Sequence, residues 1–147
     1  MSLRQRLEAD MKEAMKARDA ERRDAIRYVL SVVKNAEIDK RRDLNEDEEV
    51  QLLRTQVKQR QDAIEQFRNG GRDDLAEREA SQVSLIETYL PQQMSDDELA
   101  AFVRQGLEET GAQGPKDMGK VMGLLNKRSE GRVDGRRLSA AVRDALA

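Results

Sequence analysis

The chain of 147 residues contains no cysteine, no histidine and no tryptophan. Without thiols and imidazoles it has no cysteine nucleophile, no histidine general base and none of the usual ligands of zinc, haem or iron–sulfur clusters. We therefore expect no metal and no cofactor. Disulfides are also excluded, although a chain without cysteine is compatible with any redox compartment.

Apolar residues are scarce, because hydrophobic residues make up 37% of the chain and aromatic residues 3%. The usual hydrophobic share is about 45–50%, so we expect no large buried core. No stretch approaches the roughly 18 apolar residues of a membrane span, and the N-terminus has no apolar run of signal-peptide length. We therefore expect no membrane partner and a cytoplasmic location.

Charge is abundant instead, with 27 basic and 29 acidic residues that are interspersed, as is typical of solvated helices. Residues 1–42 hold 12 basic and 8 acidic residues, a net charge of +4. Residues 43–112 hold 7 and 17, a net charge of −10, and residues 113–147 hold 8 and 4, a net charge of +4. The last segment could supply a few phosphate contacts, whereas the middle segment should repel phosphates.

Helical spacing of apolar residues predicts four helices before Pro91. Ser2, Asp19 and Asn45 are suitable N-caps, and Gly70 is a suitable helix end. The predicted helices cover about residues 2–18, 19–41, 45–69 and 73–90.

Three further helices are predicted after Pro91, beginning at Ser95, Gly114 and Asp134. No segment alternates apolar and polar residues long enough to indicate a strand. We therefore predict an all-α fold, with a four-helix N-terminal unit over residues 1–94 and a small three-helix C-terminal unit over residues 95–147.

Several polar features have ordinary structural interpretations. Arg60 interrupts an apolar stripe, and we expect it at the edge of the packing seam with its charged end in water. The spacing of Gly119 and Gly123 favours helix packing or a soft helix over ligand contact. Paired carboxylates such as Asp73 and Asp74 stand at predicted helix starts, where they interact favourably with the helix dipole.

The C-terminal third resembles a known family. Residues 116–123 (KDMGKVMG) and 131–135 (GRVDG) resemble the C-terminal signature of the GatB/YqeY family. Shorter segments that resemble stand-alone YqeY-type members are Ala14–Ala17, Lys34–Ile38, Ile64–Phe67, Arg72–Ala76 and Tyr89–Pro91. The resemblance therefore covers essentially the whole chain.

The resemblance implies an all-helical, two-part fold similar to the C-terminal tail of the GatB component of tRNA-dependent Asp/Glu amidotransferases, a tail that helps to hold tRNA. In that family the amidation chemistry belongs to a separate domain, and these 147 residues contain nothing of it. We therefore expect no enzymatic activity, although the family name is associated with the activity of a glutamine-dependent carbon–nitrogen ligase.

The same resemblance implies which residues face RNA. Residues within the shared motif are Lys116, Gly119, Lys120, Gly123, Gly131 and Arg132. Basic residues beside the motif are Lys127, Arg128 and Arg136. We predict these nine residues as the RNA-binding site.

Three functions remain open from the sequence. The first is a non-catalytic accessory protein that binds tRNA or another structured RNA through phosphate contacts. The second is a protein-interaction module that docks on an amidotransferase or synthetase complex. The third and least favoured is a carbon–nitrogen ligase with glutamine as amido donor, for which the chain lacks any nucleophile–base pair, phosphate loop or cofactor motif.

Overall fold

The computed structural model describes residues 1–147 and contains seven α-helices, one short 3-10 helix and no strand. The all-α prediction is confirmed. The chain divides into a first unit, Met1–Leu90, and a second unit, Pro91–Ala147. The first contains α1 (Leu3–Lys16), α2 (Ala20–Lys40), α3 (Glu46–Asn69) and α4 (Asp73–Glu87), and the second contains α5 (Asp96–Thr110), η1 (Pro115–Asp117), α6 (Met118–Arg128) and α7 (Gly135–Leu146).

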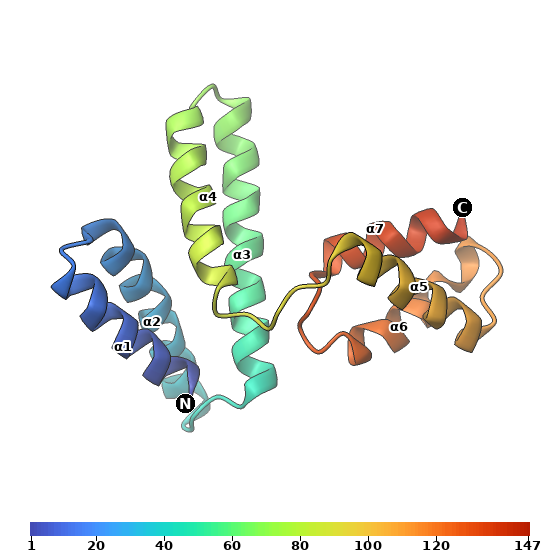
Figure 1. The fold of residues 1–147 in the computed structure, drawn as a ribbon, viewed down its shortest axis with the longest axis horizontal. Helices are drawn as coiled ribbons and strands as arrows, with labels where there is room; N and C mark the ends of the chain where they lie inside the picture. The colour runs from blue at the N-terminus through green and yellow to red at the C-terminus, as the bar shows by residue number, and fades with distance from the viewer. The chain divides into compact units, whose positions relative to one another are not determined.

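The first unit consists of two helical hairpins, α1–α2 and α3–α4 (Figure 1). Capping boxes begin two of the helices, with Ser2 and Gln5 at α1 and Asn45 and Glu48 at α3. In each box the polar side chain accepts from a backbone N–H that has no partner within the helix. The predicted helix starts therefore follow from local hydrogen bonding.

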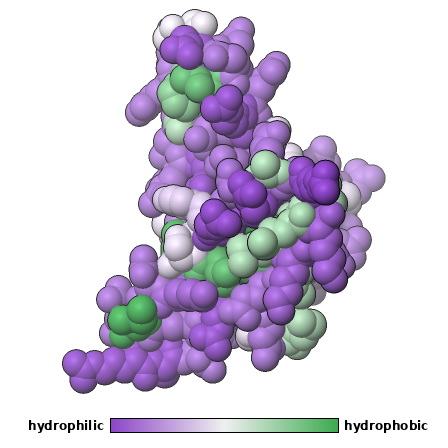
Figure 2. Space-filling model, turned by 90° about the vertical axis from the view of Figure 1, so that its left-hand side faces the viewer, coloured by the Kyte–Doolittle hydropathy of each residue, from purple (hydrophilic) through white to green (hydrophobic).

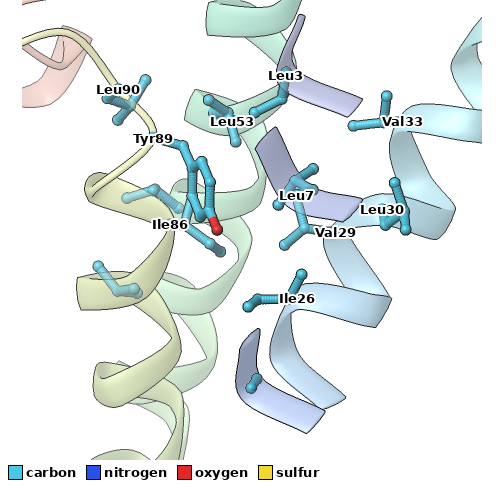
Figure 3. Packing of buried hydrophobic residues seen from close by; sticks show 13 residues of the cluster. Leu3, Leu7, Ile26, Val29, Leu30, Val33, Leu53, Ile86, Tyr89 and Leu90 are labelled. Carbon is cyan, nitrogen blue, oxygen red and sulfur yellow. The ribbon is translucent and has the colours of Figure 1, made fainter. Parts of the chain in front are cut away.

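Buried aliphatic side chains from all four helices form the core of this unit, and Figure 3 shows how those near the end of α4 meet α1 and α2. Tyr89 follows α4, is 7% exposed, and donates from its hydroxyl to Asp10 Oδ2 at 2.5 Å. The guanidinium of Arg6 lies 5.1 Å from the centre of the same ring. Tyr89 thus links the end of α4 to α1 by packing, a hydrogen bond and a cation–π contact.

The second unit has its own core, to which Met94, α5, α6 and α7 contribute. Gly106 of α5 is buried. A Cβ atom added there would lie 2.7 Å from Leu125 Cδ2 of α6. The absence of a side chain at this one position lets α5 and α6 approach closely.

Residues 91–94 belong with the second unit, whereas the sequence analysis placed its start at residue 95. The amide N–H of Met94 donates to the carbonyl oxygen of Arg132 at 2.8 Å, and Gln93 Nε2 donates to the carbonyl oxygen of Gly131 at 3.1 Å. Hydrogen bonds to residues that are distant in the sequence therefore attach this segment to the unit that follows it.

Two sequence predictions are corrected at the level of helices. Arg60 does not extend into water, because its side chain is only 10% exposed and is held by neighbouring side chains. The helix expected from Pro115 begins as the 3-10 turn η1, and α6 starts at Met118.

The surface is strongly polar, in keeping with the charged composition. In Figure 2, which faces the side of the first unit where α1 and α2 lie, hydrophilic residues cover most of the surface, and hydrophobic ones form a band across its middle and a few smaller patches. No helix combines the length and the apolar character that crossing a membrane would require.

Candidate nucleic-acid interface

Five of the nine predicted RNA-binding residues lie on one exposed side of η1 and α6. They are Lys116, Gly119, Lys120, Gly123 and Lys127, and we call them the lysine–glycine face. Within α6, the spacing of Gly119, Lys120, Gly123 and Lys127 places these four residues on one side of the helix, and the exposed Lys116 precedes them in η1. Lys120 and Lys127 are separated by about 10 Å along the helix axis at 1.5 Å per residue.

The opposite side of α6 explains why this face points outward. Val121 and Leu125 are 0% and 1% exposed and pack into the core of the second unit. Because α6 has a single apolar stripe, burying these two residues turns the lysine–glycine face to solvent. The same pattern that forms the core therefore orients the predicted site.

The lysines of this face keep their charge available. Lys116, Lys120 and Lys127 are exposed, and none of them forms a salt bridge. The nearby carboxylate of Asp117 accepts instead from the backbone N–H of Gln113 at 3.0 Å. Three uncompensated positive charges thus follow one edge of the second unit.

The two glycines of the face have no packing partner. A Cβ atom at Gly119 or Gly123 would have no neighbouring heavy atom within 4 Å. Of the two structural interpretations of this spacing, helix packing is therefore wrong for this chain, whereas a soft helix is not contradicted. A glycine inside a helix costs about 0.8–1.0 kcal/mol relative to alanine, and no contact within the protein offsets that cost. The glycines leave bare backbone between the lysines.

Arg128 and Arg132 differ from the lysines of the lysine–glycine face, because both form ion pairs with residues of α5. Arg128 Nη1 pairs with Glu109, while Arg132 Nη2 pairs with Glu98 Oε2 at 2.7 Å. Arg132 Nε also donates to the carbonyl oxygen of Gln92 at 2.9 Å. The Arg132 guanidinium lowers the pKa of the Glu98 carboxyl below its usual value, mainly through their hydrogen bond. These two arginines therefore pair with carboxylates of the second unit, and their charges are partly compensated.

Gly131 and Arg136, the remaining predicted site residues, lie on other elements. Gly131 has φ +77° and follows Glu130 at φ +50°, and the N–H of Arg132 donates to the carbonyl oxygen of Ser129 at 2.9 Å. Two successive positive φ angles indicate a type I′ turn, which accounts for a glycine here. Arg136 is exposed in the first turn of α7.

The sequence analysis missed Arg137 as a structural residue. Its Nη1 donates to the carbonyl oxygen of Met94 at 2.6 Å, and its Nη2 pairs with Asp96 Oδ1 at 2.6 Å. Arg137 thus connects α7 to the start of α5. No local pattern distinguishes it from the neighbouring Arg136, because its partners lie about forty positions earlier in the chain.

The acidic residues do not gather into a metal site, since no group of three or more is arranged to hold an ion. Around the lysine–glycine face the chemically active groups are the ammonium groups of the three lysines. Such groups bind anions and neutralise charge.

Three fungal proteins named "Altered inheritance of mitochondria protein 41, mitochondrial" are similar to this chain. The protein of Lachancea thermotolerans is 36% identical over 143 residues, which cover 92% of this chain and 76% of the relative. The protein of Pyrenophora tritici-repentis is 29% identical over 147 residues, covering 96% and 79%. The protein of Eremothecium gossypii is 34% identical over 145 residues, with the same 96% and 79%.

The names of these relatives contradict the cytoplasmic location predicted from the sequence, because all three are named as mitochondrial proteins. That prediction used the absence of an apolar run near the N-terminus. Mitochondrial import segments are amphipathic and rich in arginine, so this absence does not distinguish the two compartments.

The family comparison agrees with the resemblance seen in the sequence. A family model described as "Yqey-like protein" matches residues 4–146, which include both units and the lysine–glycine face. This match, together with 36% identity to the Lachancea thermotolerans protein over 76% of its length, shows that the chain belongs to the YqeY-like family.

Proposed function

We propose that this protein binds a structured RNA and that tRNA is the favoured ligand. In this proposal the protein catalyses no reaction itself. The lysine–glycine face of α6 contacts the phosphate backbone in this proposal. The similarity of the motif to the tRNA-holding tail of the GatB component of amidotransferases supports tRNA as the ligand.

A single observation carries the proposal, namely the combination of unpaired lysines with unpacked glycines on one helix face. Three exposed lysines have no carboxylate partner, and a side chain added at either of the two glycines between them would meet no other part of the protein. Small residues let a phosphate backbone come close to the helix, where lysine side chains neutralise it. A purely solvated helix would gain stability from alanine at both glycine positions.

Recognition in this proposal depends on shape and charge. The chain has two tyrosines and two phenylalanines, of which Tyr89 is buried and Phe102 is packed against the second core. Tyr28 is 50% exposed but belongs to α2 of the first unit and not to the helix that carries the lysine–glycine face. That face therefore offers no stacking platform for single-stranded bases. Structured RNA read through its backbone suits such a surface better.

The test is tRNA binding measured over a range of salt concentrations with the full chain and two variants. The first variant is Lys116→Gln, Lys120→Gln, Lys127→Gln, which removes the charges of the face. The matched control is Lys12→Gln, Lys34→Gln, Lys58→Gln, which removes three exposed lysines of the first unit that also lack a salt bridge.

We expect wild-type affinity to fall steeply with salt. The slope of log affinity against log salt should decrease in magnitude by up to about 2–3 in the face variant, because each lost phosphate contact removes about 0.7–0.9. The control should retain the wild-type slope. Absence of tRNA binding by the wild type, or equal slopes in both variants, contradicts the proposal and leaves protein docking on an amidotransferase or synthetase complex as the leading function.

A further inference from the structure

We propose that a cleft in the first unit is a docking site for a lysine- or arginine-rich segment of a partner protein. The cleft lies between α2 and the α3–α4 hairpin and has a volume of about 1030 Å³. This site is separate from the lysine–glycine face, and the inference does not depend on RNA binding.

Arg60 and Tyr28 line the cleft together. The Arg60 guanidinium lies 4.8 Å from the centre of the Tyr28 ring, and Tyr28 remains 50% exposed. Arg60 Nε donates to Gln82 Oε1 at 2.9 Å and its Nη1 to Gln56 Oε1 at 2.9 Å. Helices α2, α3 and α4 are therefore joined around a fixed arginine, which leaves an aromatic ring available to a ligand.

The walls of the cleft carry negative charge from two helices. Glu21 and Asp24 come from α2, and Asp74, Glu77 and Glu79 come from α4.

Two of the lining residues are basic, Arg60 and Arg78, so the lining has a net charge of −3. Glu79 Oε2 lies 3.8 Å from Arg60 Nε and offsets part of that charge. Phosphates are repelled from such a cleft, whereas cationic side chains are attracted to it.

An incoming cation would find these carboxylates accessible. Glu21 and Glu77 are exposed and form no salt bridge. Asp24 and Asp74 pair with neighbouring arginines, but their side chains are 61% and 68% exposed. Exposed pairs of this kind contribute little, so a partner's cations can replace them.

The chemistry of the cleft favours a protein segment over a single small cation. Ala25, Ala63 and Ser81 have small side chains in the lining, which leave room for a peptide backbone. Carboxylates on both walls can be contacted at the same time only by a ligand with several cations. The exposed ring of Tyr28 adds a surface on which a lysine or arginine side chain can lie.

The test uses a fluorescent peptide of alternating lysine and alanine as the probe and a glutamate–alanine peptide as its counterpart. Binding is measured by fluorescence anisotropy with the wild-type full chain, with the double variant Glu21→Gln, Glu77→Gln, and with a matched control. The control is Glu65→Gln, Glu87→Gln, which removes two exposed carboxylates from α3 and α4 outside the cleft lining.

We expect the lysine peptide to bind and the glutamate peptide not to bind. Glu21→Gln, Glu77→Gln should weaken binding by about two- to thirty-fold, as expected for the loss of two exposed ion pairs, and the control should bind like the wild type. Tyr28→Leu should also weaken binding, and circular dichroism establishes that each variant is folded. Equal affinity of the wild type and both carboxylate variants, or binding of the glutamate peptide, would overturn the proposal.

Discussion

At the residue scale, three helical glycines with the same chemistry have different environments. Gly119 and Gly123 are exposed and contact nothing, whereas Gly106 faces Leu125 of the neighbouring helix. Alanine at the first two positions should stabilise the protein by about 0.8–1.0 kcal/mol each, because alanine is the better helix former. Gly106→Ala should instead destabilise it by about 1–3 kcal/mol, because the added methyl group collides with Leu125. Urea unfolding of the three single variants measures both effects.

The same substitutions separate stability from binding. If the glycines allow the RNA backbone to come close to the helix, the double variant Gly119→Ala, Gly123→Ala should bind tRNA more weakly while being more stable than the wild type. Gly106→Ala should keep its tRNA affinity under conditions where it is folded. A gain in stability accompanied by unchanged affinity would show that the glycines have no part in binding.

At the scale of an element, the start of α3 depends on one carboxylate. Glu48 Oε1 accepts from the Asn45 N–H at 3.1 Å in the capping box, and Glu48 pairs with Arg42 Nη1 at 2.6 Å and with Lys40 Nζ at 2.7 Å. Hydrogen bonds from Arg42, then Lys40 and Asn45, lower the pKa of the Glu48 carboxyl well below its usual range. This carboxylate therefore joins the end of α2 to the start of α3.

A lowered pKa in the folded state makes this contribution dependent on pH. The stabilisation is fully present above the ordinary carboxyl pKa of about 4.3 and is lost as the pH falls through the folded-state value. Glu48→Gln preserves the capping geometry but not the charge, so its unfolding free energy should depend less on pH than that of the wild type below about pH 5. Urea unfolding across this range measures the difference, with Glu46→Gln as a control. Parallel pH curves for Glu48→Gln and the wild type would contradict the assignment.

At the scale of the whole molecule, the chain has two hydrophobic cores, one in each unit. Each core is closed by its own helices, so a cavity in one should not propagate into the other. Leu125→Ala removes a side chain that is 1% exposed and should cost the second unit about 2–5 kcal/mol. Hydrogen exchange should then show loss of amide protection in α5–α7, with protection retained in α1–α4. Loss of protection in both units would mean that they unfold together.

Helix formation in this chain could be predicted from the sequence because its signals are local. Ser2, Asn45 and Ser95 each accept from a backbone N–H three residues later, so cap and helix start are determined within one turn. The outward orientation of the lysine–glycine face follows in the same way, because apolar residues on the opposite side of α6 are buried.

The roles of the arginines were decided by tertiary structure. Arg60 was expected in water but is buried among Gln56, Gln82 and Tyr28, which come from three helices. Arg132, within the shared motif, and Arg128, beside it, were predicted to bind RNA, yet both pair with acids of α5. The sequence by itself determined the seven helices and the exposed face of α6, since capping and periodicity act over a few residues. Only the tertiary structure decided which charges are compensated, because an ion pair depends on groups that folding brings together from distant positions.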